Sequence, residues 1–163
     1  MSLAAIIVLA LVTLQRLSEL ALSRRNTRRL LARGAVEVAP GHYPLIVGLH
    51  AAWLGGLWAL AWDRPVNLAW LLVFVLLQAG RAWVLLSLGE RWTTRIIVLP
   101  GAPLVRRGPY RLVSHPNYMV VAAEILVLPL AFGLPLFGLA FSLLNAAVLA
   151  IRIRAEARAL AAA

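Results

Sequence analysis

Long apolar segments constrain this chain more than any other feature of its sequence. Five of them follow one another, at residues 3–22, 45–62, 66–88, 117–132 and 135–153. A helix needs roughly 20 apolar residues to cross the hydrocarbon core of a bilayer, so the last two segments are short for a span. Because lipid satisfies no backbone polar group, segments of this kind cross the membrane as helices. We therefore predict an all-α integral membrane protein with about five transmembrane helices.

The composition supports this fold class and narrows the chemistry. Of the 163 residues, 63% are hydrophobic and 13% are charged, which is more apolar surface than one soluble domain of this length can bury. We expect a single domain that covers residues 1–163. Cysteine is absent, which excludes disulfides, thiolate metal sites and cysteine nucleophiles. The three histidines lack the spacing of metal ligands, so we predict no metal site.

The arginines predict the orientation in the membrane. Lysine is absent, so all 16 basic residues are arginine, and the net charge is +10. Most arginines fall in residues 24–33, 91–111 and 152–158, whereas the opposite connections hold only Asp63 and Arg64. Arginine-rich loops stay in the cytoplasm, so we expect the N-terminus outside and the C-terminus and both long loops inside. No aromatic residues alternate with the arginines, and we predict no nucleic-acid partner.

The connection between the third and fourth segments, residues 89–115, is unusually long. It contains Pro100, Gly101, Pro103, Gly108 and Pro109, so it cannot form one helix. Its apolar stretches at residues 96–99 and 104–105 predict that it folds back on the bundle or on the membrane interface. The turn at residues 133–135 then joins the last two segments as a C-terminal helical hairpin.

The strongest local motif is Gly108-Pro109-Tyr110-Arg111, followed by His115-Pro116-Asn117-Tyr118. Pro116 suits the first turn of a helix, where its missing N–H costs nothing. His115 would then lie at the mouth of the fourth helix, near its positive end, and Tyr118 one turn inside. The alternative interpretation is an ordinary helix start with an interfacial tyrosine.

A polar stripe on the last helix is the second motif. Asn145, Arg152 and Glu156 share one helix face at their spacing. Polar groups in membrane helices usually face a cavity or the bundle interior, which favours a function for Asn145 and Glu156. An arginine at the interface that pairs with Glu156 is the alternative.

Four further polar residues lie within the apolar segments. They are Gln78, Arg81, Glu124 and His50. An unpaired carboxylate at Glu124 would be costly, so it could pair with Arg81 in a structural contact. His50 we interpret as a packing residue.

These motifs together resemble the isoprenylcysteine carboxyl methyltransferase family. The resemblance rests on Gly108–Arg111, on His115–Tyr118 and on Arg152–Glu156, and it covers the chain closely from about Gly89 onward. The residues 94–101 and the short length are similar to small bacterial members that O-methylate alkylpyrones or alkylresorcinols. Two positions depart from the family pattern: Ser114 replaces an arginine and Ala157 replaces a second glutamate.

The resemblance implies S-adenosylmethionine as the methyl donor, S-adenosylhomocysteine as the product, and the bacterial inner membrane as the location. Residues 1–88 would be N-terminal helices, and residues 89–163 a cofactor-binding loop and a catalytic hairpin. The residues implied to bind the cofactor are Tyr110, Arg111, His115, Pro116, Tyr118 and Glu156, and those implied at the methyl-transfer centre are Asn145, Arg152 and Glu156. Arg111 or Arg107 could replace the missing arginine.

The acceptor stays open at this point. A lipophilic small molecule that enters from the bilayer, among the membrane lipids, is the implied substrate. A prenylated-cysteine carboxylate and a lipid amine are alternative acceptors, and a non-enzymatic membrane subunit is an alternative function. The sequence leaves the oligomeric state undetermined.

Overall fold

The computed structural model describes the backbone of residues 2–161 and the side chains as far as residue 158. It contains five α-helices: α1 (Leu3–Ala32), α2 (Tyr43–Ala61), α3 (Leu68–Leu88), α4 (Pro116–Ala131) and α5 (Pro135–Ala161). Four of them are long and apolar enough to cross a membrane, and α4 is a shorter apolar helix. The prediction of an all-α integral membrane protein with about five helices and a C-terminal hairpin is confirmed.

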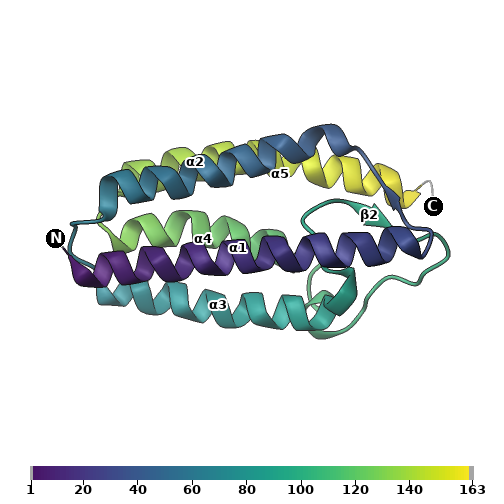
Figure 1. Ribbon diagram of the computed structural model, residues 1–163, viewed down its shortest axis with the longest axis horizontal. Coiled ribbons are helices and arrows are strands. Elements are labelled where there is room, and N and C mark those ends of the chain that lie inside the picture. Colours follow the sequence, from purple (N-terminus) through teal and green to yellow (C-terminus); the bar gives the residue numbers. More distant parts are fainter. Residues whose placement is uncertain (1, 162–163) are drawn as a thin grey trace.

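The five helices run side by side as a long bundle (Figure 1). Helix α4 packs against α3 and α5, and α2 packs against α5 and α1. Helices α1, α3 and α5 all terminate at the same side of the bundle. The long connection between α3 and α4 lies there, and we therefore call this side the "loop end". The arginine-rich segments therefore gather at one end of the molecule.

Two helices are longer than predicted. Helix α1 continues to Ala32 rather than residue 22, and α5 to Ala161 rather than residue 153. The arginines that were expected in loops are good helix formers and extend these helices beyond the apolar span. Helix α1 ends only where Arg33 donates its backbone N–H to the Leu30 and Leu31 carbonyls and Gly34 adopts a φ of 85°.

A cluster of four charged side chains, here called the ionic cluster, joins α1, α3 and α4. Its members are Arg16, Glu19, Arg81 and Glu124. Arg81 Nη1 lies 2.8 Å from Glu124 Oε2 and its guanidinium also binds both carboxylate oxygens of Glu19. Arg16 contacts Glu124 at 2.8 Å and Glu19 at 3.2 Å. The predicted pair of Arg81 and Glu124 is confirmed, and the second pair, Arg16 and Glu19 from α1, keeps the cluster neutral.

The long connection folds back on the loop end, as predicted. Its β2 (Ile97–Val98) pairs antiparallel with β1 (Val36–Glu37), which follows α1. Asn26 on α1 donates to the carbonyl oxygens of Gly89 and Trp92 at 3.2 and 2.9 Å. These contacts hold the segment over the ends of the helices, where it forms one wall of the site described next.

Candidate active site

The histidine–proline motif starts α4. Pro116 is the first residue of α4, and His115 precedes it with φ −130° and ψ 59°. The His115 ring stacks on the Tyr118 ring, with 5.2 Å between the ring centres and 15° between the planes. Both rings thus lie at the loop end of α4, one helical turn apart.

The Tyr118 hydroxyl connects this motif to the polar stripe of α5. It donates to Glu156 Oε2 at 2.6 Å and accepts from Arg152 Nε at 2.8 Å. Arg152 Nη1 donates in turn to the carbonyl oxygen of Thr94 at 2.7 Å. His115 Nδ1 lies 3.9 Å from the same Glu156 oxygen. Two motifs that are far apart in sequence therefore meet in one hydrogen-bonded network.

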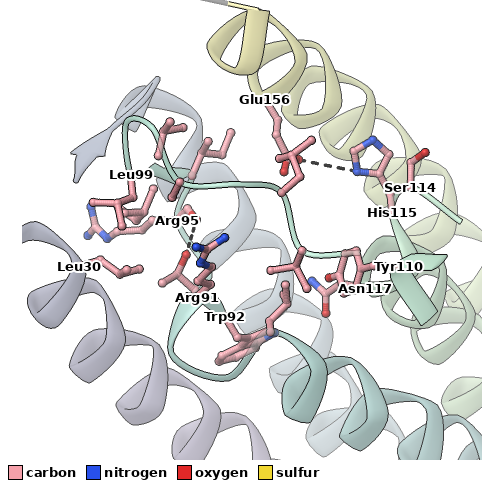
Figure 2. Close-up of a pocket in the computed structure, with 18 of the residues that line it drawn as sticks. Leu30, Arg91, Trp92, Arg95, Leu99, Tyr110, Ser114, His115, Asn117 and Glu156 are labelled. Carbon is pink, nitrogen blue, oxygen red and sulfur yellow. Dashed lines mark hydrogen bonds and ion pairs between the residues drawn. The ribbon is translucent and has the colours of Figure 1, made fainter. Parts of the chain in front are cut away.

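This network forms one wall of a cavity of about 500 Å³ at the loop end, here called the loop-end cavity. Figure 2 shows Glu156 and His115 together on one side of it, with Tyr110 and Asn117 nearby and Arg91, Trp92 and Arg95 farther across the cavity. Burial, together with the nearby Glu156 carboxylate, raises the pKa of Tyr110 to about 12. The Tyr110 phenol is therefore protonated at neutral pH and able to donate a hydrogen bond.

A second cavity of about 290 Å³ lies deeper, among the membrane-spanning helices, and is here called the membrane cavity. Its wall is mostly apolar and comes from α1, α2 and α5, with Arg16, Glu19 and Arg81 of the ionic cluster on one side. Five residues line both cavities, and we call them the neck: Trp92, Thr93, Asn117, Tyr118 and Arg152. The two cavities are thus neighbours that share these five residues.

The structure brings together most, but not all, of the residues singled out from the sequence. Tyr110, His115, Tyr118, Arg152 and Glu156 all line the loop-end cavity. Pro116 is buried at the start of α4, and Asn145 is buried on the wall of the membrane cavity. Arg111 is exposed on a 3₁₀ turn and lines neither cavity.

Neither arginine that was expected to replace the missing one at Ser114 lines the loop-end cavity. Arg107 does not line the loop-end cavity, because its Nε donates to the Ser87 carbonyl at 2.7 Å. Arg91, Arg95 and Arg106 line it instead. Sequence reasoning missed these three, together with the neck residues Trp92 and Thr93, because they carry no periodic signal within an irregular segment. Asn117 lies in the histidine–proline motif, at the start of α4, but was given no role.

Comparison with known proteins shows which family this chain is similar to. The model of the isoprenylcysteine carboxyl methyltransferase (ICMT) family matches residues 70–162, which include most of α3, the neck, the histidine–proline motif and the stripe on α5. The chain belongs to this family. Its ICMT-family assignment identifies it as a methyltransferase of the membrane, in agreement with the resemblance seen in the sequence.

Two relatives extend over almost the whole chain. The uncharacterized protein YpbQ of Bacillus subtilis is 39% identical over 159 residues, which is 94% of this chain and 95% of the relative. An uncharacterized protein of Haemophilus influenzae is 28% identical over 161 residues, which is 89% of this chain and 88% of the relative. No solved structure matches this ICMT-family chain. The family thus gives the reaction class, and these relatives leave the acceptor unnamed.

Gly108 is a position at which this site should be sensitive to a single methyl group. It has a φ of 57°, and a Cβ there would collide with Ser87 and approach the Trp83 ring nitrogen to 3.1 Å. We expect Gly108→Ala to displace the turn that carries Tyr110 and to lower the melting temperature. Gly101 is the matched control, because its φ of 72° is also left-handed but its Cβ would meet nothing within 4 Å.

Thermal unfolding in detergent, followed by tryptophan fluorescence, compares the two variants. Gly101→Ala should lower the free energy of unfolding by about 1–2 kcal/mol, which is the cost of an alanine in the left-handed conformation. Gly108→Ala should lower the free energy of unfolding by clearly more, because its Cβ also collides with Ser87. Equal losses would show that the turn relaxes freely away from α3.

Proposed function

We propose that this protein transfers a methyl group from S-adenosylmethionine to an oxygen of a lipid-tailed acceptor, such as an alkylpyrone or an alkylresorcinol. S-Adenosylhomocysteine would be the second product. Family membership supports the methyl transfer, and the residues 94–101 resemble members that act on these acceptors. The oxygen acceptor and its alkyl tail are our inference from the cavities and from that resemblance.

The observation that carries the proposal is the junction of two unlike cavities. The loop-end cavity is lined by arginines, a glutamate and aromatic rings, whereas the membrane cavity is mostly apolar. A transfer reaction needs its two reactants held about 3–3.5 Å apart and aligned. Ligands that fill the two cavities would meet at the neck, beside Tyr118 and Arg152.

The loop-end cavity has the properties that S-adenosylmethionine requires. Its volume of about 500 Å³ falls within the usual range for small-molecule sites. When bound, the cofactor supplies a methyl group on a positively charged sulfonium. Aromatic faces such as those of Tyr110 and Tyr118 attract cations, and Glu156 accepts hydrogen bonds from hydroxyl or amino groups. Arg91, Arg95 or Arg106 would bind the cofactor's carboxylate.

The proposed roles of the site residues follow from these positions. We assign Tyr110, His115, Tyr118 and Glu156 to the cofactor, with Pro116 fixing the start of α4 beneath them. Arg152 and Asn145 would face the acceptor, Arg152 at the neck and Asn145 on the wall of the membrane cavity. In this assignment Arg111 stays outside the site, and residues 89–163 carry the catalytic half of one domain.

The same geometry supports an orientation. The arginines at the loop end should stay in the cytoplasm, which places the loop-end cavity and the C-terminus inside and the N-terminus outside. Water-soluble cofactor would then enter from the cytoplasm, and the acceptor from the bilayer. The bacterial inner membrane is the location that fits this arrangement.

Calorimetric titration of S-adenosylmethionine into the purified, detergent-solubilised protein tests the proposal first. The wild type should bind, and His115→Ala should bind about tenfold more weakly, because the imidazole that stacks on Tyr118 is lost. Leu112→Ala is the control, since its side chain is 77% exposed on the same segment. A folded wild type that binds no cofactor would favour the alternative of a non-enzymatic membrane subunit.

Methyl transfer assays then separate the acceptors. Product should form with an alkylresorcinol or an alkylpyrone, and none with a prenylcysteine analogue or a lipid amine. Transfer to either of the latter two would replace the proposed acceptor while leaving the methyltransferase assignment intact.

A further inference from the structure

One side of α1 changes from apolar to basic at the point where the hydrocarbon core should end. The large exposed side chains of its membrane part share this side and are all apolar: Leu3, Ile7, Leu11, Leu14 and Leu17. Arg24, Arg25 and Arg28 continue the same side of the helix and are also exposed. At 1.5 Å per residue, Arg24 lies about 31 Å from Leu3, which matches the thickness of the hydrocarbon core. These three arginines, here called the basic face, therefore lie at the level of the lipid headgroups.

No described carboxylate neutralises the basic face. The chain has only six acidic residues. Five of them have partners elsewhere: Glu19 and Glu124 in the ionic cluster, Glu37 with Arg95, Glu90 with Arg29 and Arg33, and Glu156 with Tyr118. The sixth, Asp63, follows α2 at the opposite end of the bundle. Among the residues that the structure describes, the basic face thus has no acidic partner, and its three positive charges point outward at headgroup level.

The opposite side of the same turns of α1 holds the segment that carries Trp92 and Thr93 of the neck. The Ser23 hydroxyl accepts from the Thr94 backbone N–H at 2.8 Å. Asn26 donates to the Trp92 carbonyl at 2.9 Å. Figure 1 shows these last turns of α1 at the loop end, beside β2. A ligand on the basic face would therefore bind the part of α1 that positions one wall of the neck.

We propose that the basic face binds the phosphate groups of anionic phospholipids in the leaflet at the loop end. Guanidinium groups match phosphate in charge and in hydrogen-bond geometry, and these three emerge directly from the lipid-facing stripe of the helix. Arginines anywhere in the loops would suffice to set the orientation in the membrane. Their placement without acidic partners on the lipid-facing side is what points to a bound headgroup. Such a lipid holds the end of α1 and, through Ser23 and Asn26, stabilises the neck segment.

Thermal unfolding in neutral detergent micelles tests the proposal at 0.15 M salt, followed by tryptophan fluorescence. A rising fraction of dioleoylphosphatidylglycerol should raise the melting temperature of the wild type, whereas dioleoylphosphatidylcholine should not. Arg24→Gln combined with Arg25→Gln should need roughly 25-fold more of the anionic lipid for the same shift, about fivefold for each arginine. In phosphatidylcholine this double variant should melt as the wild type does, which shows that its fold is intact.

Arg29→Gln combined with Arg33→Gln is the matched control. It removes two arginines from the same helix, but these face Glu90. Screening within about 8 Å at this salt concentration should limit its effect on the lipid requirement to about twofold. Equal losses in the two double variants would overturn the site, because total charge would then explain the effect. The same conclusion would follow if both lipids shifted the wild type equally, or if inorganic phosphate alone raised its melting temperature.

Hydrogen exchange tests the link between the lipid and the neck. With phosphatidylglycerol, the backbone amides of residues 89–94 should exchange more slowly in the wild type but not in Arg24→Gln combined with Arg25→Gln. Unchanged exchange in residues 89–94, together with a raised melting temperature, would overturn the link and restrict the lipid to a local contact of α1. This inference does not rest on methyl transfer, so a protein that transfers no methyl group would leave it standing.

Discussion

Arg81→Ala is expected to lower the free energy of unfolding by about 3–5 kcal/mol, because it leaves two buried carboxylates without their main partner. The Arg81 side chain is 8% exposed, and its guanidinium binds both Glu19 and Glu124. Glu124 is fully buried, so water cannot replace the lost contact. Unfolding of the detergent-solubilised protein by titration with dodecyl sulfate, followed by its tryptophan fluorescence, measures the change.

Two further variants show whether charge pairing is the cause. Arg25→Ala removes an exposed arginine from α1 and should change stability by no more than about 0.5 kcal/mol. Arg81→Met combined with Glu19→Gln removes one charge of each sign and should recover a large part of the loss. A double variant that is less stable than Arg81→Ala would contradict a pairing role and indicate that packing around the guanidinium matters more.

Arg152→Ala is expected to reduce methyl transfer by about 10²-fold or more while cofactor binding changes much less. Arg152 holds the Tyr118 hydroxyl at 2.8 Å and the Thr94 carbonyl at 2.7 Å, so it fixes the neck between the two cavities. Displacing reacting groups by about 1 Å can cost a factor of 10² in rate. Comparison of kcat with the cofactor dissociation constant separates the two effects.

Arg154→Ala is the matched control for this experiment. Arg154 lies two residues further along α5 and is exposed, so its loss removes the same charge without touching the neck. Its kcat should equal that of the wild type. If Arg152→Ala and Arg154→Ala were equally active, the neck would not position the reactants. A lowered melting temperature of Arg152→Ala alone would instead indicate a structural role.

The fold could be predicted from the sequence because the membrane imposes a simple rule on the helices. Apolar segments located all five helices, and the predicted bounds of α3 and α4 differ from the structure by two residues or fewer. The ends of α1 and α5 could not be predicted in this way, because hydropathy marks where lipid ends and not where the helix ends. Arginine has a helix propensity similar to that of leucine, so arginine-rich segments extend the helix beyond the lipid.

The candidate site could be predicted only where its residues share a local period. Arg152 and Glu156 are four residues apart on one helix, and His115 and Tyr118 flank the first turn of another, so their faces follow from helix geometry. Trp92 and Thr93 at the neck could not be inferred, since their positions depend on how an irregular segment folds over the bundle.

The ionic cluster also has a consequence for how the chain enters the membrane during synthesis. Arg16 and Glu19 pair within α1, so that helix brings no net charge from these residues into lipid. Helix α3 brings Arg81 and α4 brings Glu124, each with an opposite charge that the other neutralises. When α3 is inserted, Arg81 can pair with Glu19 of α1, but the cluster then still has one excess positive charge. This charge is neutralised only when α4 brings Glu124, which lies 108 residues after Arg16. We expect α3 to stay beside the insertion machinery until α4 joins it, so that the two helices leave for the bilayer as a pair.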